Sequence, residues 1–144
     1  MRILAILTGL ALAASPAAAQ KADWDALGAE FCRLTLAGDL GAMAPILSRQ
    51  LQADIAAARG NPDLPPPRTL FQSYSNEFPV CQADTHNTAL IEIRRSAASG
   101  TPSWTEYAVV VPEPDGTSRI DDVLFATRKS DTLRARLEYY AANR

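Results

Sequence analysis

The sequence has 144 residues, of which 47% are hydrophobic and 21% charged, with 14 basic and 16 acidic side chains, two Cys and one His. This length suits a single domain with one core. A net charge of -2 gives no cationic excess to neutralise phosphates, so the composition excludes a basic nucleic-acid-binding protein. It also excludes a disordered acidic tail and a cysteine-dense scaffold.

Residues 1–19 have the pattern of a secretory signal peptide. Arg2 provides a positive charge, residues 3–14 form an apolar run, and Pro16 interrupts it before the small residues Ala17 and Ala19. We expect cleavage after Ala19, which leaves residues 20–144 as a single α+β domain in the periplasm or outside the cell. The alternative is an N-terminal membrane anchor, but the run is shorter than the roughly 20 residues that a stable membrane span needs.

The two cysteines, Cys32 and Cys81, allow one intramolecular pairing. In an oxidising compartment we expect this disulfide to form and to join the first helix to the sheet. Two free thiols and an intermolecular bridge are the alternatives.

Apolar spacing predicts two N-terminal helices. The first begins at an N-cap, Asp23, and ends at Gly38. The second follows a cap at Asp39, and Pro45 separates its short first turn from a longer helix that ends near Gly60. Their predicted inward residues are Trp24, Leu27, Phe31 and Leu34 in the first helix, and Leu40, Met43, Leu47, Leu51 and Ile55 in the second.

Residues 61–67 are rich in proline and are interpreted as a stiff surface connection. A proline-rich recognition ligand, through the PxxP motif at residues 62–65, is the alternative interpretation. The helical spacing does not continue beyond this connection.

After Pro79 the apolar residues alternate, as is typical of strands. The predicted strands cover residues 78–83, 89–96, 104–111 and 119–128. Turn signals at 97–103 and 114–116 make the last three of these strands an antiparallel meander. A final helix from about Asp131 directs Leu133, Leu137 and Tyr140 inward. The predicted fold class is α+β, with a curved antiparallel sheet of about four strands packed on the N-terminal helices and followed by a C-terminal helix.

A likeness to a known family lies in residues 116–125, G-T-S-R-I-D-D-V-L-F. They resemble the G-x-W-x-I-D-D-V-x-Y pattern of small secreted bacterial domains of the nuclear transport factor two-like, cystatin-like superfamily. Residues 133–137 match that family's L-R-x-x-L helix, and residues 38–40, G-D-L, fit the connection between its first helices. Ser118 and Phe125 stand where the family has Trp and Tyr.

The resemblance implies a cystatin-like cone with a cavity between the sheet and the helices. It implies no particular reaction, because this fold includes isomerases, dehydratases and many non-catalytic members.

Asp121 and Asp122 are the candidate catalytic residues, as alternatives to each other. Adjacent strand residues point to opposite faces, so one carboxylate would face the cavity. A carboxylate in an apolar pocket has a raised pKa and can act as a general base. The alternative is structural: the inward Asp binds backbone amides or pairs with an arginine, for example Arg94 or Arg95.

Enzymes of the fold that the chain resembles, where they move protons next to a carbonyl, combine such a base with a Tyr or a protonated acid as oxyanion donor. Four tyrosines are candidates by residue type alone: Tyr74, Tyr107, Tyr139 and Tyr140.

The single His, His86, follows Asp84 by two residues, and these two side chains are far short of the three or four ligands of a metal site. A G-x-S-x-G elbow is missing, and so are a P-loop, a dinucleotide fingerprint and an EF-hand loop, so we expect neither a metal nor a cofactor. Trp104, Tyr107 and Phe125 are candidate pocket-lining residues, with plain core packing as the alternative.

These features favour a non-enzymatic module that binds a small apolar ligand or a periplasmic protein. Two other functions stay open: a cofactor-free isomerase or lyase that uses Asp121 or Asp122 as its base, and an inhibitor of an extracellular hydrolase.

Overall fold

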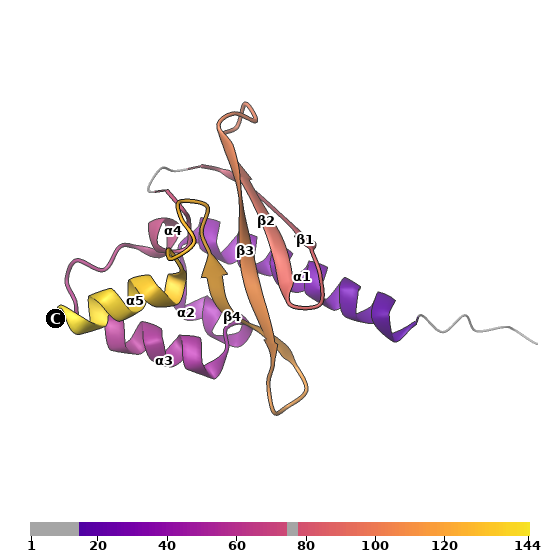
Figure 1. Ribbon diagram of the computed structural model, residues 1–144, viewed down its shortest axis with the longest axis horizontal. Helices are drawn as coiled ribbons and strands as arrows, with labels where there is room; N and C mark the ends of the chain where they lie inside the picture. The colour runs from indigo at the N-terminus through magenta and orange to yellow at the C-terminus, as the bar shows by residue number, and fades with distance from the viewer. Residues whose placement is uncertain (1–14, 75–77) are drawn as a thin grey trace, which may run out of the picture.

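The computed structural model describes residues 15–74 and 78–144. Its elements are, in chain order, α1 (Pro16–Ala37), α2 (Leu40–Met43), η1 (Ala44–Ile46), α3 (Arg49–Ala58), α4 (Pro67–Leu70), β1 (Val80–Thr85), β2 (Leu90–Ser96), β3 (Ser103–Pro112), β4 (Ser118–Leu124) and α5 (Leu133–Ala142). The strands form one antiparallel meander in the order β1-β2-β3-β4. Helix α1 packs along β1 and β2, and α3 packs against α5 beside β4 (Figure 1). The predicted α+β class is confirmed.

The first helix begins earlier than predicted. Ser15 is its N-cap, and its hydroxyl accepts a hydrogen bond from the Ala18 amide at 3.3 Å. Pro16 starts the helix rather than breaking it, because the first helical position needs no N–H donor. The predicted cleavage site after Ala19 therefore lies in the exposed first turns of α1. Residues 1–14 of the predicted signal peptide lie outside the described residues.

Around Pro45 the predicted break between a short turn and a longer helix is confirmed. The chain becomes extended at Leu47, which forms a parallel bridge with Ile120 of β4. The Ser48 amide donates to the Ile120 carbonyl at 2.8 Å, and the Ser48 side chain caps α3. The start of α3 is therefore fixed to the edge strand of the sheet.

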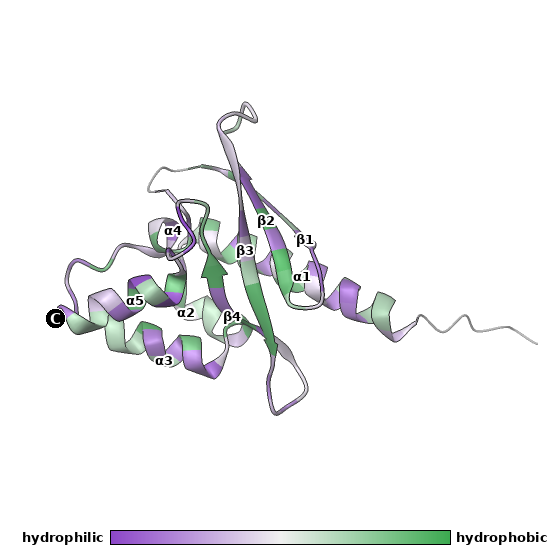
Figure 2. Cartoon of the chain, in the orientation of Figure 1, coloured by the Kyte–Doolittle hydropathy of each residue, from purple (hydrophilic) through white to green (hydrophobic). Residues whose placement is uncertain are grey.

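The predicted apolar stripes form the core. Its fully or almost fully buried members include Trp24, Phe31 and Leu34 of α1, Met43, Leu47, Leu51 and Ile55 of the next helical segments, Ile91, Ile93, Ala108, Val110, Ile120 and Val123 of the sheet, and Leu133 and Leu137 of α5. Leu27, Leu40 and Tyr140 pack against this core from partly buried positions. Figure 2 shows hydrophobic stretches within β2 and β3.

Two contacts bring α1 close to the sheet. The predicted disulfide between Cys32 and Cys81 is confirmed, and it joins α1 to β1 across 49 positions of chain. Closing a loop of that length stabilises the fold by about 4 kcal/mol in the chain-entropy account. Gly28 is buried against Ala83 and Ile91, where a side chain would have no room.

Candidate functional site

The two aspartates proposed from the sequence lie at a β-bulge in β4. Val109 pairs with Asp122 and Val110 pairs with Ile120, so Asp121 is the extra residue. The bulge interrupts the alternation on which the prediction of opposite faces rested. Asp121 and Asp122 both contact Arg134 of α5.

Asp121 connects β4 to two helices. Its carboxylate accepts a hydrogen bond from the Ser48 hydroxyl at 2.6 Å, and its other oxygen lies 3.2 Å from Nη1 of Arg134. The same Ser48 oxygen accepts from the Leu51 amide at 3.0 Å, and Arg134 also pairs with Asp54 of α3 at 3.0 Å. The side chain of Asp121 thus holds the start of α3 and the side of α5 against the edge strand.

Asp122 binds the start of the C-terminal helix, whose N-cap is Thr132. Its Oδ1 accepts hydrogen bonds from the backbone amides of Val123, at 2.8 Å, and Arg134, at 3.0 Å. Arg134 lies in the first turn of α5, where backbone amides have no partner within the helix. These contacts are of the kind that the structural alternative describes, although the arginine is Arg134 rather than Arg94 or Arg95. A catalytic role for either aspartate stays a prediction.

The three aromatic candidates for a pocket lie in different surroundings. Trp104 packs edge-on against Tyr74 and Phe78, with ring centroids 4.9 and 4.6 Å away. Tyr107 lies on the other face of β3 and contacts the His86 ring, centroid to centroid 5.0 Å. Phe125 is buried beyond the end of β4. The structure does not gather these three rings around one cavity.

A buried ion pair lies where the sheet faces the helices. Arg95 of β2 and Glu106 of β3 both have fully buried side chains, and Nε of Arg95 donates to Oε2 of Glu106 at 2.8 Å. Oε1 of Glu106 accepts from the Trp104 indole at 2.8 Å and from the Ser73 amide at 2.5 Å. Strand alternation could have revealed the pair, since Arg95 shares a face with Ile93, and Glu106 with Ala108.

Arg95 and Arg136 donate hydrogen bonds to backbone carbonyls of the chain segment at the end of α4 and directly after it. Arg95 approaches from the sheet. Its Nη2 donates to the Phe71 carbonyl at 3.0 Å. The second is Arg136 of α5, whose Nη1 and Nη2 donate to the Gln72 carbonyl at 2.6 Å and the Ser73 carbonyl at 3.1 Å. Residues 70–73 are therefore held from the sheet on one side and from α5 on the other.

All five N–H donors of Arg136 are engaged. Besides the bonds to Gln72 and Ser73, Nη1 donates to the Leu70 carbonyl at 3.3 Å, and Nε and Nη2 each donate at 2.8 Å to the carboxylate of Asp131. The guanidinium also lies 3.7 Å from the centre of the Phe125 ring. The Arg136 hydrogen bond is the main cause that lowers the pKa of Asp131 below its usual range.

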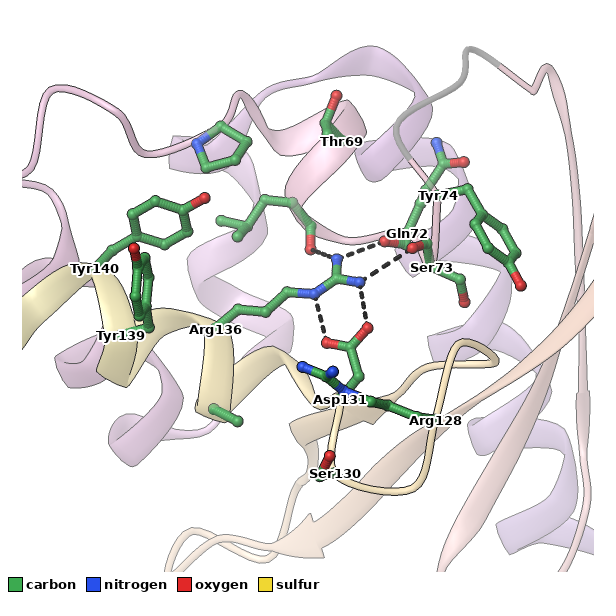
Figure 3. A pocket seen from close by; sticks show the side chains of 13 residues that line it. Thr69, Gln72, Ser73, Tyr74, Arg128, Ser130, Asp131, Arg136, Tyr139 and Tyr140 are labelled. Carbon is green, nitrogen blue, oxygen red and sulfur yellow. Dashed lines mark hydrogen bonds and ion pairs between the residues drawn. The ribbon is translucent and has the colours of Figure 1, made fainter.

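A groove of about 570 Å³ opens beside Arg136, between α5 and the segment around α4 (Figure 3). We call it the tyrosine groove. It is lined by Pro65, Thr69, Leu70, Gln72, Ser73, Tyr74, Arg128, Ser130, Asp131, Ala135, Arg136, Tyr139 and Tyr140. This volume lies within the range of small-molecule binding sites.

The rim of the tyrosine groove carries exposed aromatic surface. The side chains of Tyr74 and Tyr139 are 43% and 63% exposed, and they are the exposed large hydrophobic residues of the described chain. Arg128 lies on the same rim and is exposed, and within residues 15–74 and 78–144 its side chain makes neither an ion pair nor a hydrogen bond. From the sequence, Tyr74 and Tyr139 were candidates only as oxyanion donors. The groove is built from segments that are distant in the sequence, and no local sequence pattern predicts such a groove.

Three further observations bear on function. Comparison with known proteins finds no family model, no curated protein and no solved structure that matches this chain. Among the helices that the structure describes, none is long and apolar enough to cross a membrane. Within the same described residues, no three His, Cys, Asp or Glu side chains are placed to hold a metal ion together.

Proposed function

We propose that this protein is a non-enzymatic binding module that acts in the periplasm or outside the cell, and that its ligand occupies the tyrosine groove. The observation that carries the proposal is the gathering of exposed Tyr74 and Tyr139 at one groove of ligand-sized volume. Exposed tyrosines supply large contact area at low entropic cost, which is why they recur in binding sites.

The backbone of one wall of the groove is held in place by hydrogen bonds from Arg136. Arg136 fixes the backbone of residues 70–73 through three carbonyl oxygens, and its own position is fixed by Asp131. A preformed site loses little conformational entropy when it binds. The aspartates that could serve as a catalytic base are instead engaged with Ser48, Arg134 and backbone amides. These contacts favour binding over catalysis.

Two observations support the location. The disulfide between Cys32 and Cys81 is of the kind that persists in oxidising compartments. The signal-peptide pattern of residues 1–19 agrees with export. We further propose membership of the nuclear transport factor two-like superfamily, which the order of helices, meander and C-terminal helix supports.

A thermal-shift screen against a small-molecule library tests the function. The variant Tyr139→Ala removes exposed groove surface from α5 without harming helix propensity, and Glu138→Ala is the control at the neighbouring position outside the groove. We expect compounds that raise the melting temperature of the wild type and of Glu138→Ala, with a smaller rise for Tyr139→Ala. A screen without hits, or with hits that Tyr139→Ala leaves unchanged, would overturn the proposal.

A second candidate function, inhibition of an extracellular hydrolase, is favoured by the hairpin between β2 and β3. Its tip, residues 98–102, is exposed and projects beyond the body of the protein in Figure 1. Three hydrogen bonds stiffen the tip: the Ala97 amide to the Pro102 carbonyl, the Gly100 amide to the Ala97 carbonyl, and the Ser99 hydroxyl to the Thr101 carbonyl. A rigid projecting loop of this kind can enter an active-site cleft.

Inhibition assays against representative secreted proteases and glycosidases test this candidate. We expect the wild type to inhibit one class and a variant with Asn-Gly in place of residues 98–101 to lose that inhibition. Equal activity of the hydrolases with and without the wild-type protein would exclude this function.

A further inference from the structure

We propose that the ligand of the tyrosine groove is a small aromatic carboxylate, with its carboxylate on Arg128 and its ring against Tyr139. This inference rests on the proposed binding function and names the chemical class of the ligand. It follows from the charges and the rings of the groove, considered in turn.

The charges of the groove leave one cation available. Asp131 and Arg136 neutralise each other through two parallel hydrogen bonds, and Arg136 has no donor left for a ligand. Arg128 has no such partner among the described residues, and it lies close enough to lower the pKa of Asp131 further. The groove thus carries one net positive charge in a protein whose net charge is -2. An anionic group on the ligand complements it.

The anion must belong to a larger molecule. A free inorganic anion is held by several converging hydrogen-bond donors. Among the described residues of the groove, Arg128 is the one charged side chain whose N–H groups make no hydrogen bond within the protein. The planar guanidinium suits a carboxylate, which can accept two parallel hydrogen bonds from it. A single exposed ion pair contributes little affinity, so the remaining contacts must come from the body of the ligand.

Aromatic surface supplies those contacts. Tyr139 and Tyr140 meet edge to face, with ring centroids 5.3 Å apart, and Tyr139 remains 63% exposed. Tyr74 lies on the far side of Arg136 from them in Figure 3, and its ring packs edge-on against Trp104 instead. An aromatic ring bound beside Tyr139 can stack on it or meet it edge-on, arrangements that aromatic pairs prefer. Hydroxyl groups of Thr69 and Ser130 line the same groove for polar substituents.

A nuclear magnetic resonance titration with four matched probes tests the assignment. Phenylacetate carries both ring and charge, phenylacetamide lacks the charge, cyclohexylacetate lacks the aromatic ring, and acetate lacks any ring. We expect phenylacetate to cause saturable shifts at Arg128, Ser130 and Tyr139. Phenylacetamide and cyclohexylacetate should each bind about fivefold more weakly, the factor that an exposed ion pair or a single aromatic contact supplies.

Two variants complete the test. Arg128→Gln should bind phenylacetate about fivefold more weakly, with no effect on phenylacetamide, and Lys129→Gln controls for loss of a neighbouring charge outside the groove. Equal binding of phenylacetate and phenylacetamide, or by the wild type and Arg128→Gln, would overturn the assignment, as would the absence of saturable shifts. If screening hits still depend on Tyr139, only the ligand class is wrong; if none does, the binding function itself fails.

Discussion

Arg95 and Glu106 form a fully buried ion pair between β2 and β3, with Nε of Arg95 2.8 Å from Oε2 of Glu106. They are diagonal neighbours, because Arg95 lies opposite Trp104 and Glu106 lies opposite Ile93. Glu106 also accepts a hydrogen bond from the Ser73 amide, and Arg95 donates a hydrogen bond to the Phe71 carbonyl. The pair therefore connects the sheet to the segment that carries Tyr74 into the groove.

Removing one member of this pair should be far more harmful than removing both. Glu106→Leu leaves the Arg95 charge buried without its partner, and we expect a loss of about 3–5 kcal/mol in the free energy of unfolding. The double variant Arg95→Met with Glu106→Leu should recover part of that loss, because no unpaired charge remains. Urea unfolding followed by circular dichroism measures both. A double variant less stable than Glu106→Leu alone would contradict this account.

The fold was predictable where residue periodicity reports directly on packing. Trp24, Phe31 and Leu34 follow helical spacing and are buried, and the alternation of Ile91 and Ile93 places them in the core. The disulfide was predictable because two cysteines allow a single intramolecular bridge.

The site was less predictable because distant segments build it. Arg136 binds backbone carbonyls of residues 70–73, and a backbone carbonyl leaves no mark in the sequence. The bulge at Asp121 was missed for a related reason, since the residues I-D-D-V read equally well as a regular strand. The short helix α4 (Pro67–Leu70) was missed because it begins at the last of three consecutive prolines. Such a run of prolines by itself indicates a loop.

Gly28 should not tolerate even a methyl group. A Cβ at this position of α1 would lie 2.7 Å from the Cβ of Ala83 and 2.9 Å from Cγ2 of Ile91. Helix and sheet would have to separate, so we expect Gly28→Ala to cost about 1–3 kcal/mol despite its better helix propensity. Gly41→Ala is the control, because its nearest neighbour is an Asp39 oxygen at 3.4 Å. If thermal unfolding gives both variants the melting temperature of the wild type, the close approach of α1 to the sheet at Gly28 is refuted.

Asp25 should contribute to stability only above acid pH. Its pKa is lowered from 3.8 to about 2, first by the hydrogen bond from Lys21 and then by the amide and hydroxyl of Thr85. A carboxyl whose folded pKa is depressed stabilises the protein above its unfolded pKa and loses that contribution as the pH falls through the folded value. Asp25→Asn should therefore lower stability at about pH 6, and the difference from the wild type should shrink between about pH 4 and pH 2.

Urea unfolding over that pH range measures the effect of Asp25. The control is Asp23→Asn, which replaces an exposed carboxylate of α1 that takes no part in the contacts with Lys21 and Thr85. A difference between Asp25→Asn and the wild type that stays constant from neutral to acid pH would mean that the contacts with Lys21 and Thr85 do not depend on the charge.

Asp121 and Asp122 should each matter for stability, whatever else they do. Asp121→Asn weakens the contacts with Ser48 and Arg134, and Asp122→Ala removes the acceptor for the Arg134 amide at the start of α5. We expect losses of about 1 kcal/mol for each, the usual effect of losing a helix cap or a partly exposed charged hydrogen bond. Chemical denaturation measures them. Variants as stable as the wild type would remove the structural role and leave the carboxylates free for chemistry.

Arg136 should be irreplaceable by lysine, because its role depends on five donors in one plane. Arg136→Lys keeps the charge beside Asp131 but offers three donors on a flexible stem, so several carbonyls of residues 70–73 lose their partner. We expect a loss of about 2–3 kcal/mol and faster hydrogen exchange at the amides of residues 71–74. Arg33→Lys is the matched control, since Arg33 makes a similar two-bond contact with Glu30 on the exposed side of α1. Exchange that accelerates equally in both variants would mean that Arg136 does not hold the groove.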